Sequence, residues 1–129
     1  DLACGAVLMQ QGKPVEFFSE KFGPVQQRYS AHEREAFGMV RALRHFKKLL
    51  VGYKFVVWTD HKPLVVWRER NAVSERHLKW LASIAKLDFE VRYIEGHRNV
   101  LADLMSRPAD AQKSSVIEFM RQAQASRLR

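Results

Sequence analysis

The run Lys54–Thr59 is the feature of this sequence that most constrains its fold. From Phe55 onward it consists only of β-branched and aromatic residues. A short, uninterrupted run of this kind is typical of a strand buried on both faces, inside a sheet that helices cover. The run ends at Asp60, and Pro63 then favours the start of a short helical turn that we expect to reach Trp67. The sequence therefore predicts a sheet with helices packed on it.

A capping box predicts the start of the longest helix. Ser30 precedes Glu33 by three residues, so each side chain can bind the backbone amide of the other. Three- and four-residue steps then place one stripe of mostly apolar residues on the helix, and we expect Gly52 to end it. The stripe consists of Phe37, Val40, Leu43, Lys47 and Leu50.

The remaining elements alternate between strand and helix patterns. We expect a hairpin from runs 6–9 and 15–18, a helix capped by Ser74, a strand over 89–94 and a last helix over 100–106. The residues of the Ser74 helix predicted to face inward are Leu78, Leu81, Ala82, Ile84 and Ala85. The order predicts an α/β fold, a mixed sheet flanked by helices.

Composition limits the partners. The chain has 129 residues, enough for one domain, and a formal net charge of +8, which attracts polyanions such as nucleic acid. Cys4 is the only cysteine, so no internal disulfide can form. No apolar run approaches the roughly 18 residues that a membrane helix needs, so we expect no membrane partner.

Three acids lie where a sheet protein could bind a ligand. Glu35 falls early in the long helix, Asp60 at the carboxyl end of the buried strand, and Asp103 in the last helix. Ligands of open α/β sheets gather at the carboxyl ends of strands. Each acid also has an ordinary interpretation: a helix-start acid, a turn residue and an exposed helix residue, respectively. Spacing alone leaves both interpretations open.

Four short motifs occur in one order along the chain. They are Gly5-Ala6-Val7-Leu8, Tyr29-Ser30 ahead of Glu33 and Glu35, Trp58-Thr59-Asp60-His61-Lys62-Pro63-Leu64, and Asn99-Val100-Leu101-Ala102-Asp103-Leu104-Met105-Ser106-Arg107. Together they resemble the ribonuclease H domain of gypsy-type LTR retrotransposon reverse transcriptases. The resemblance predicts a ribonuclease H-like domain over 1–108 and a basic tail or linker over 109–129 toward the next polyprotein segment.

The resemblance implies a five-stranded mixed sheet, flanked by helices, that carries a nuclease site. Four acids of this family hold two Mg²⁺ ions, which Mn²⁺ can replace, and hydrolyse the RNA strand of RNA·DNA hybrids during reverse transcription. Carried over to this sequence, the catalytic metal ligands are Glu35, Asp60 and Asp103, while Glu33 belongs to the capping box. Carboxylates suit Mg²⁺, and two such ions can flank a scissile phosphate.

The first of the four acids would fall before residue 1. Asp1 matches a later position of the same motif. We therefore expect the first strand to be largely missing from this chain, and the chain itself to be weakly active or inactive as an endonuclease.

Further residues are candidates for assisting cleavage or gripping the substrate. His97, in the loop before the last helix, matches a loop that often holds a histidine in other ribonucleases H; it could equally be a surface residue. A basic and aromatic face would bind hybrid phosphates, or be a solvated face with the tryptophan in the core. Its members are Arg68, Arg70, Arg76, Lys79 and Trp80.

Two other functions compete with the nuclease. One is an inactive ribonuclease H-like module that binds nucleic acid or tethers neighbouring domains. The other is a DNA-binding regulator, for which the sequence has no helix-turn-helix or zinc signature. On the nuclease hypothesis we expect the partners to be the RNA·DNA hybrid and the polymerase and integrase segments of the same polyprotein. The expected location is inside the cell, in a cytoplasmic particle or the nucleus, without secretion.

Overall fold

The fold was analysed in a computed structural model. It describes residues 3–11, 13–68, 74–94 and 115–120, the last of these as backbone only. The elements in chain order are β1 (Ala3–Gln10), β2 (Lys13–Lys21), α1 (Pro24–Gln27), α2 (Ala31–His45), α3 (Lys47–Leu50), β3 (Lys54–Thr59), a 3-10 helix η1 (Lys62–Val66), α4 (Glu75–Ser83), β4 (Asp88–Tyr93) and β5 (Ser115–Met120). The α/β class predicted from the sequence is confirmed.

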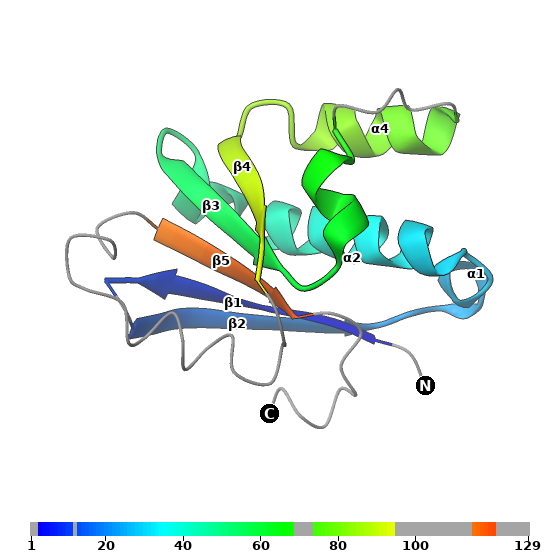
Figure 1. The fold of residues 1–129 in the computed structure, drawn as a ribbon, viewed down its shortest axis with the longest axis horizontal. Helices are drawn as coiled ribbons and strands as arrows, with labels where there is room; N and C mark the ends of the chain where they lie inside the picture. The colour runs from blue at the N-terminus through cyan, green and yellow to red at the C-terminus, as the bar shows by residue number, and fades with distance from the viewer. Residues whose placement is uncertain (1–2, 12, 69–73, 95–114, 121–129) are drawn as a thin grey trace.

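One five-stranded mixed sheet organises the described residues, in the order β2-β1-β5-β3-β4. β1 is antiparallel to both β2 and β5, whereas β3 is parallel to both β4 and β5. Helices α2 and α4 lie on the same side of the sheet (Figure 1). Their apolar faces and the sheet enclose the core.

The β1–β2 hairpin forms as predicted, with a register irregularity after Leu8. Gln11 in its turn has a φ of 52°, the left-handed conformation that tight hairpin turns require. β1 is buried over seven of its eight positions, while β2 alternates, with Phe17 exposed and Phe18 half-buried. This pattern agrees with an inner strand beside an edge strand.

Helix α2 begins at the predicted capping box and ends earlier than predicted. The amide of Glu33 donates to Ser30 Oγ and the amide of Ser30 donates to Glu33 Oε1, both at 3.2 Å. The helix stops at His45, because Phe46 turns fully into the core before α3 begins. Val40 and Leu43 are buried as expected, but Phe37 is only half-buried and the stripe also includes Ala36 and Met39.

The second half of the domain follows the predicted order, but the predicted burial needs correction in β3 and in α4. In β3, Phe55, Val57 and Thr59 are buried, but Val56 and Trp58 are only half-buried, so the prediction of a strand buried on both faces is wrong.

Helix α4 begins at the predicted cap, where Ser74 Oγ accepts from the His77 amide at 3.2 Å. The inward face of this helix was predicted only in part. Ile84 is buried and Leu81 half-buried, whereas Leu78 is 56% exposed. Ala82 and Ala85 are also exposed, because the half-buried Trp80 takes the position against the core.

The centre of the sheet contains an element that the sequence did not suggest. Residues 109–129 were expected to form a tail or linker, but Ser115–Met120 lies between β1 and β3 as β5. This strand explains why the sheet has five strands although the first strand of the family was expected to be missing. The predicted helix over 100–106 lies outside the described residues.

A single cluster of buried side chains joins the two layers. It contains Ala6 and Leu8 of β1, Met39 and Leu43 of α2, and Val57 of β3, among others. None of the described helices is long and apolar enough to cross a membrane. The fold therefore holds α2 and β3, which carry two of the predicted acids, against a common core.

Candidate active site

Glu35 lies in the second turn of α2 and is only 3% exposed. A glutamate is rarely so deeply buried, and its carboxylate is costly to bury unless polar partners or a cation stabilise it. Ala36, next in the helix, is completely buried, so the backbone here is held tightly against the sheet. The interpretation of Glu35 as a solvated helix-start acid is therefore wrong.

Glu33, two residues earlier, is in a different environment. Its Oε1 accepts from the Ser30 amide, and its Oε2 accepts from Arg76 Nη1 at 2.9 Å. The hydrogen bond from the Ser30 backbone is the largest cause that lowers the pKa of Glu33, and Arg76 and His77 add to it. Glu33 therefore caps α2, as the capping-box assignment requires, and also fastens the start of this helix to α4.

Asp60 follows the last residue of β3 and is half-buried. Its Oδ1, like Oε2 of Glu35, is shielded from solvent. The strand end beneath it is fixed, because Thr59 is completely buried and its carbonyl accepts from the Ile94 amide at 2.8 Å. The Thr59 hydroxyl also accepts from the His61 amide at 3.1 Å. Asp60 thus projects from a rigid strand end, the place where open sheets bind ligands.

A contact between two histidine rings joins the elements that carry the two acids. The ring centroids of His32 and His61 are 5.9 Å apart. His32 precedes Glu35 by one helical step of three residues, and His61 follows Asp60 directly. Residues three apart lie on the same side of a helix, so the contact brings the acid-bearing side of α2 to the end of β3.

Neither histidine was predicted to contribute to the site. The spacing of three from His32 to Glu35, together with His61 next to Asp60, was the signal that could have identified them.

The other predicted catalytic residues lie outside the described part of the chain. These are Asp103 and His97, and among the predicted substrate contacts Arg70. Within the described residues, no group of three or more His, Cys, Asp or Glu side chains is arranged to hold a metal ion. Of the three predicted metal ligands, Glu35 and Asp60 therefore lie in the part of the chain that the structure describes.

The basic face predicted on α4 has a partly structural role. Arg76 pairs with Glu33, and its guanidinium lies 4.3 Å from the centre of the Tyr29 ring. Arg68 lies 4.0 Å from the Phe89 ring centre and donates to the Phe89 carbonyl at 2.5 Å. Lys79 is exposed. Among the described basic residues of this set, Lys79 is therefore the one without a structural contact of the kind that Arg68 and Arg76 make.

Trp80 belongs to an aromatic cluster between α2, α4 and η1. Its ring centroid lies 5.8 Å from that of Phe37, 6.0 Å from Tyr29 and 6.3 Å from Trp67. His77 lies 5.1 Å away on the same helix. These contacts agree with the alternative interpretation in which Trp80 packs against the core.

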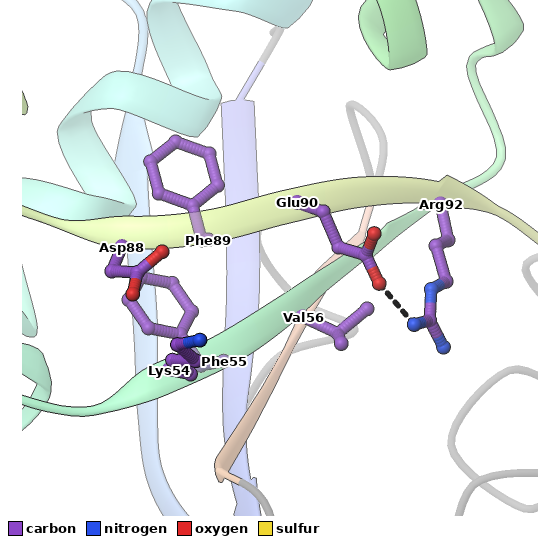
Figure 2. A pocket seen from close by; sticks show the side chains of 7 residues that line it. All are labelled: Lys54, Phe55, Val56, Asp88, Phe89, Glu90 and Arg92. Atoms are coloured by element: carbon purple, nitrogen blue, oxygen red, sulfur yellow. Dashed lines mark hydrogen bonds and ion pairs between the residues drawn. The ribbon is translucent and has the colours of Figure 1, made fainter.

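The pocket shown in Figure 2 lies away from the acids, at the start of β3 and β4. It has a volume of about 350 Å³ and is lined by residues of these two strands, among them Lys54, Asp88 and Glu90. Asp88 is the register partner of Lys54, at the opposite end of β3 from Asp60. The pocket therefore supplies no part of the candidate site.

The family model described as an RNase H-like domain found in reverse transcriptase matches residues 1–87, which include Glu35 and Asp60. The chain belongs to this family. The resemblance that was based on the sequence motifs, and the fold that it implied, are confirmed.

Two curated relatives of this ribonuclease H-like domain are polyproteins. A retrovirus-related Pol polyprotein from transposon 297 of Drosophila melanogaster is 34% identical over 107 residues, which is 83% of this chain and 10% of the relative. The transposon Tf2-3 polyprotein of Schizosaccharomyces pombe is 30% identical over 119 residues, 85% of this chain and 9% of the relative. The domain thus spans about a tenth of the length of these relatives.

Proposed function

We propose that this ribonuclease H-like domain is an endonuclease that hydrolyses the RNA strand of RNA·DNA hybrids during reverse transcription, as part of a retrotransposon polyprotein. One observation carries the proposal: the buried acid of α2 and the acid at the end of β3 lie on elements that meet at the His32–His61 contact. The family match and the polyprotein relatives support it.

The donor set of the candidate site suits Mg²⁺. Glu35 and Asp60 supply carboxylate oxygens shielded from solvent, which are ligands that Mg²⁺ and Mn²⁺ prefer. We propose that both acids are metal ligands and that Asp103 provides a further carboxylate. A pair of such ions, when bound, supplies an activated water and stabilises the leaving oxygen of the phosphodiester.

The contribution of the protein is to fix the positions of the acids. Glu35 belongs to a helix whose first turn is pinned by Ser30 and Arg76, and Asp60 follows a strand end pinned by Ile94. Rigid placement matters, because misplacement of a catalytic group by about 1 Å can cost about 100-fold in rate. Burial of Glu35 also lowers the local dielectric and so strengthens its interaction with any cation.

Substrate binding is proposed to use the surplus of positive charge. The net charge of +8 attracts the phosphates of a hybrid, and Lys79 is exposed on α4 to contact them. We propose that His97 and Arg70 assist at the cleavage site and in binding, respectively, and that polymerase and integrase segments flank the domain.

A second candidate function is an inactive module that binds nucleic acid or tethers its neighbours. The observation that favours it is the surplus of positive charge, +8, which attracts nucleic acid whether or not the site cuts it. The two functions differ in one measurable property, since only the nuclease cuts the hybrid.

The proposal is tested by cleavage of a hybrid labelled on its RNA strand, with Mg²⁺ or Mn²⁺. The chain and a longer polyprotein segment containing it are compared with Glu35→Gln and Asp60→Asn variants. Asp88→Asn is the matched control, because Asp88 lies at the other end of the β3–β4 pair. We expect the two site variants to lose at least about 100-fold in rate and the control to keep it. Full activity in either site variant would refute the site assignment.

A further inference from the structure

Four exposed apolar side chains gather at one end of the sheet. Val15 near the start of β2, Leu49 of α3, and Val51 and Tyr53 of the turn after α3 are between 44% and 64% exposed, and we call them the α3 patch. The end of β1 and the start of β3 lie together at this end of the sheet (Figure 1). Single exposed apolar residues are ordinary, whereas a group of them marks an interaction surface.

A small pocket lies among the residues of the α3 patch. It has a volume of about 150 Å³ and is lined by Leu8, Gln10, Val15, Leu49 and Tyr53. Gln10 supplies an amide, and the other four side chains are apolar or aromatic. A whole small-molecule site usually has a volume of about 300–1,000 Å³. A pocket of this smaller size suits one apolar anchor side chain of a protein partner.

The turn that presents the α3 patch is held by local hydrogen bonds. The Val51 amide donates to the Lys47 carbonyl at 3.0 Å, and the Tyr53 amide donates to the Leu50 carbonyl at 3.1 Å. Leu50 is fully buried and so anchors α3 in the core. Gly52 has a φ of 87°, the left-handed conformation that glycine adopts most readily. Because the turn is already ordered, a partner would lose little entropy to rearrangement on binding.

Positive charge surrounds the α3 patch. Residues 10–15 and 47–54, which form it, contain lysines but no aspartate or glutamate. Glu16, the next residue of β2, pairs with His45 at 3.4 Å, and Asp88 lies opposite one of the lysines in the β3–β4 ladder. The two segments therefore fit a partner that carries carboxylates. The lysines are Lys13, Lys47, Lys48 and Lys54.

We propose that the α3 patch is a docking surface for another protein, through a segment in which apolar side chains are flanked by acidic residues. An apolar side chain of that segment enters the pocket lined by Leu49 and Tyr53, and its acidic residues pair with the surrounding lysines. Asp60 follows the other end of β3, which at six residues measures about 20 Å. A docked partner therefore leaves the candidate active site open.

This inference goes beyond the proposed nuclease function and does not depend on it. It concerns a protein contact at the opposite end of β3 from Asp60, so its readout is peptide binding rather than cleavage. A failure of the nuclease assay leaves it untouched, and its own failure leaves the nuclease proposal untouched.

The test measures binding of synthetic peptides to the full chain by NMR, through the amide resonances of residues 47–54. The probe has the sequence Asp-Glu-Leu-Leu-Glu-Asp. One control peptide replaces both leucines by serine, and a second replaces all four acids by lysine. We expect saturable shifts of these resonances with the probe and none with either control peptide at the same concentration.

Two substitutions in the chain locate the binding. Leu49→Ser removes one wall of the pocket, and Leu78→Ser is the matched control, because Leu49 is 48% exposed on α3 and Leu78 is 56% exposed on α4. We expect Leu49→Ser to weaken binding of the probe about tenfold or more and Leu78→Ser to leave it unchanged. Tyr53→Ser changes a second, more exposed wall of the pocket and should act as Leu49→Ser does.

The absence of saturable shifts with the probe would overturn the proposal. Binding of the probe that both Leu49→Ser and Tyr53→Ser leave unchanged would overturn it too. Equal binding of the serine control peptide, or the same shifts at lower concentrations of an RNA·DNA hybrid than of the probe, would also contradict it. The lysines would then form a site for polyanions such as nucleic acid rather than a docking surface for protein.

Discussion

His32 of α2 and His61 after β3 face each other with ring centroids 5.9 Å apart and ring planes inclined by 31°. The contact spans the two elements that carry Glu35 and Asp60. Glu35 and Asp60 are 25 positions apart in the chain. The contact between the two rings brings the elements that carry them together. Either ring can therefore be changed, without touching either acid, to test what the contact contributes to the site.

The histidine contact predicts a positioning role for His61. His61→Ala removes the ring, and we expect cleavage of the hybrid to fall about tenfold because Asp60 loses lateral support. His61→Phe keeps an aromatic ring against His32 and should retain most of the activity. His45→Ala is the control, since His45 lies at the opposite end of α2. Equal loss in His61→Phe and His61→Ala would show that the imidazole itself is required.

The pKa of Glu33 predicts how stability depends on pH. This carboxyl has a folded pKa below its ordinary value of 4.5, so its contribution is present above that value and is lost as pH falls through the folded pKa. We expect Glu33→Gln to lower the free energy of unfolding by about 0.5–1 kcal/mol near neutral pH, as for other partly exposed pairs. The difference from the wild type, measured by urea unfolding, should shrink as the pH falls below 4.5 and vanish once the folded carboxyl is protonated. A difference that is constant with pH would contradict the assignment.

Cys4 should be chemically silent in the folded domain. Burial is the main cause that raises the pKa of its thiol to about 12, and the nearby carboxylate of Glu20 adds to the rise. The reactive thiolate is therefore scarce, and we expect reaction with a disulfide reagent at about pH 8 to follow the opening of the fold. A Cys4→Ser/Lys48→Cys variant, with an exposed thiol, should react at once. Equally fast reaction of Cys4 would show that β1 is accessible.

Among substitutions in α4, we expect replacement of Trp80 to lower the stability of the domain most. Trp80→Ala removes ring contacts with Phe37, Tyr29 and Trp67, and we expect a loss of about 2–3 kcal/mol in the free energy of unfolding. Tyr53→Ala is the comparison, because Tyr53 is 64% exposed and should cost less than about 0.5 kcal/mol. If Trp80→Ala unfolds like the wild type but binds hybrid more weakly, Trp80 contacts the substrate.

Local patterns predicted the elements that local interactions determine. The Ser30–Glu33 capping box and the run Phe55–Thr59 each specify their own structure, and both were found where expected. The end of α2 was missed because Phe46 leaves the helix for a fully buried position, which depends on the sheet beneath it. Leu78 was wrongly assigned to the core, because helical periodicity alone does not show which residue of α4 faces the sheet. In the structure Trp80 takes the inward position.

The centre of the sheet could not be predicted from local pattern. Residues 116–120 carry an apolar pattern that is compatible with either a helix or a strand, and only the gap between β1 and β3 selects the strand. Glu35 and Asp60 were singled out because they lie in specific motifs, and their roles stay predictions. Their mutual support by His32 and His61 is a tertiary contact and emerged only from the structure.

The most direct test of the account is strand-selective cleavage of an RNA·DNA hybrid by the polyprotein segment that contains this domain. With Mg²⁺, we predict cuts in the RNA strand alone, and none when Glu35→Gln and Asp60→Asn are combined. Cleavage that survives the double change, or binding of the hybrid with no cleavage by the unaltered segment, would contradict the claim that these two acids form the centre of a nuclease.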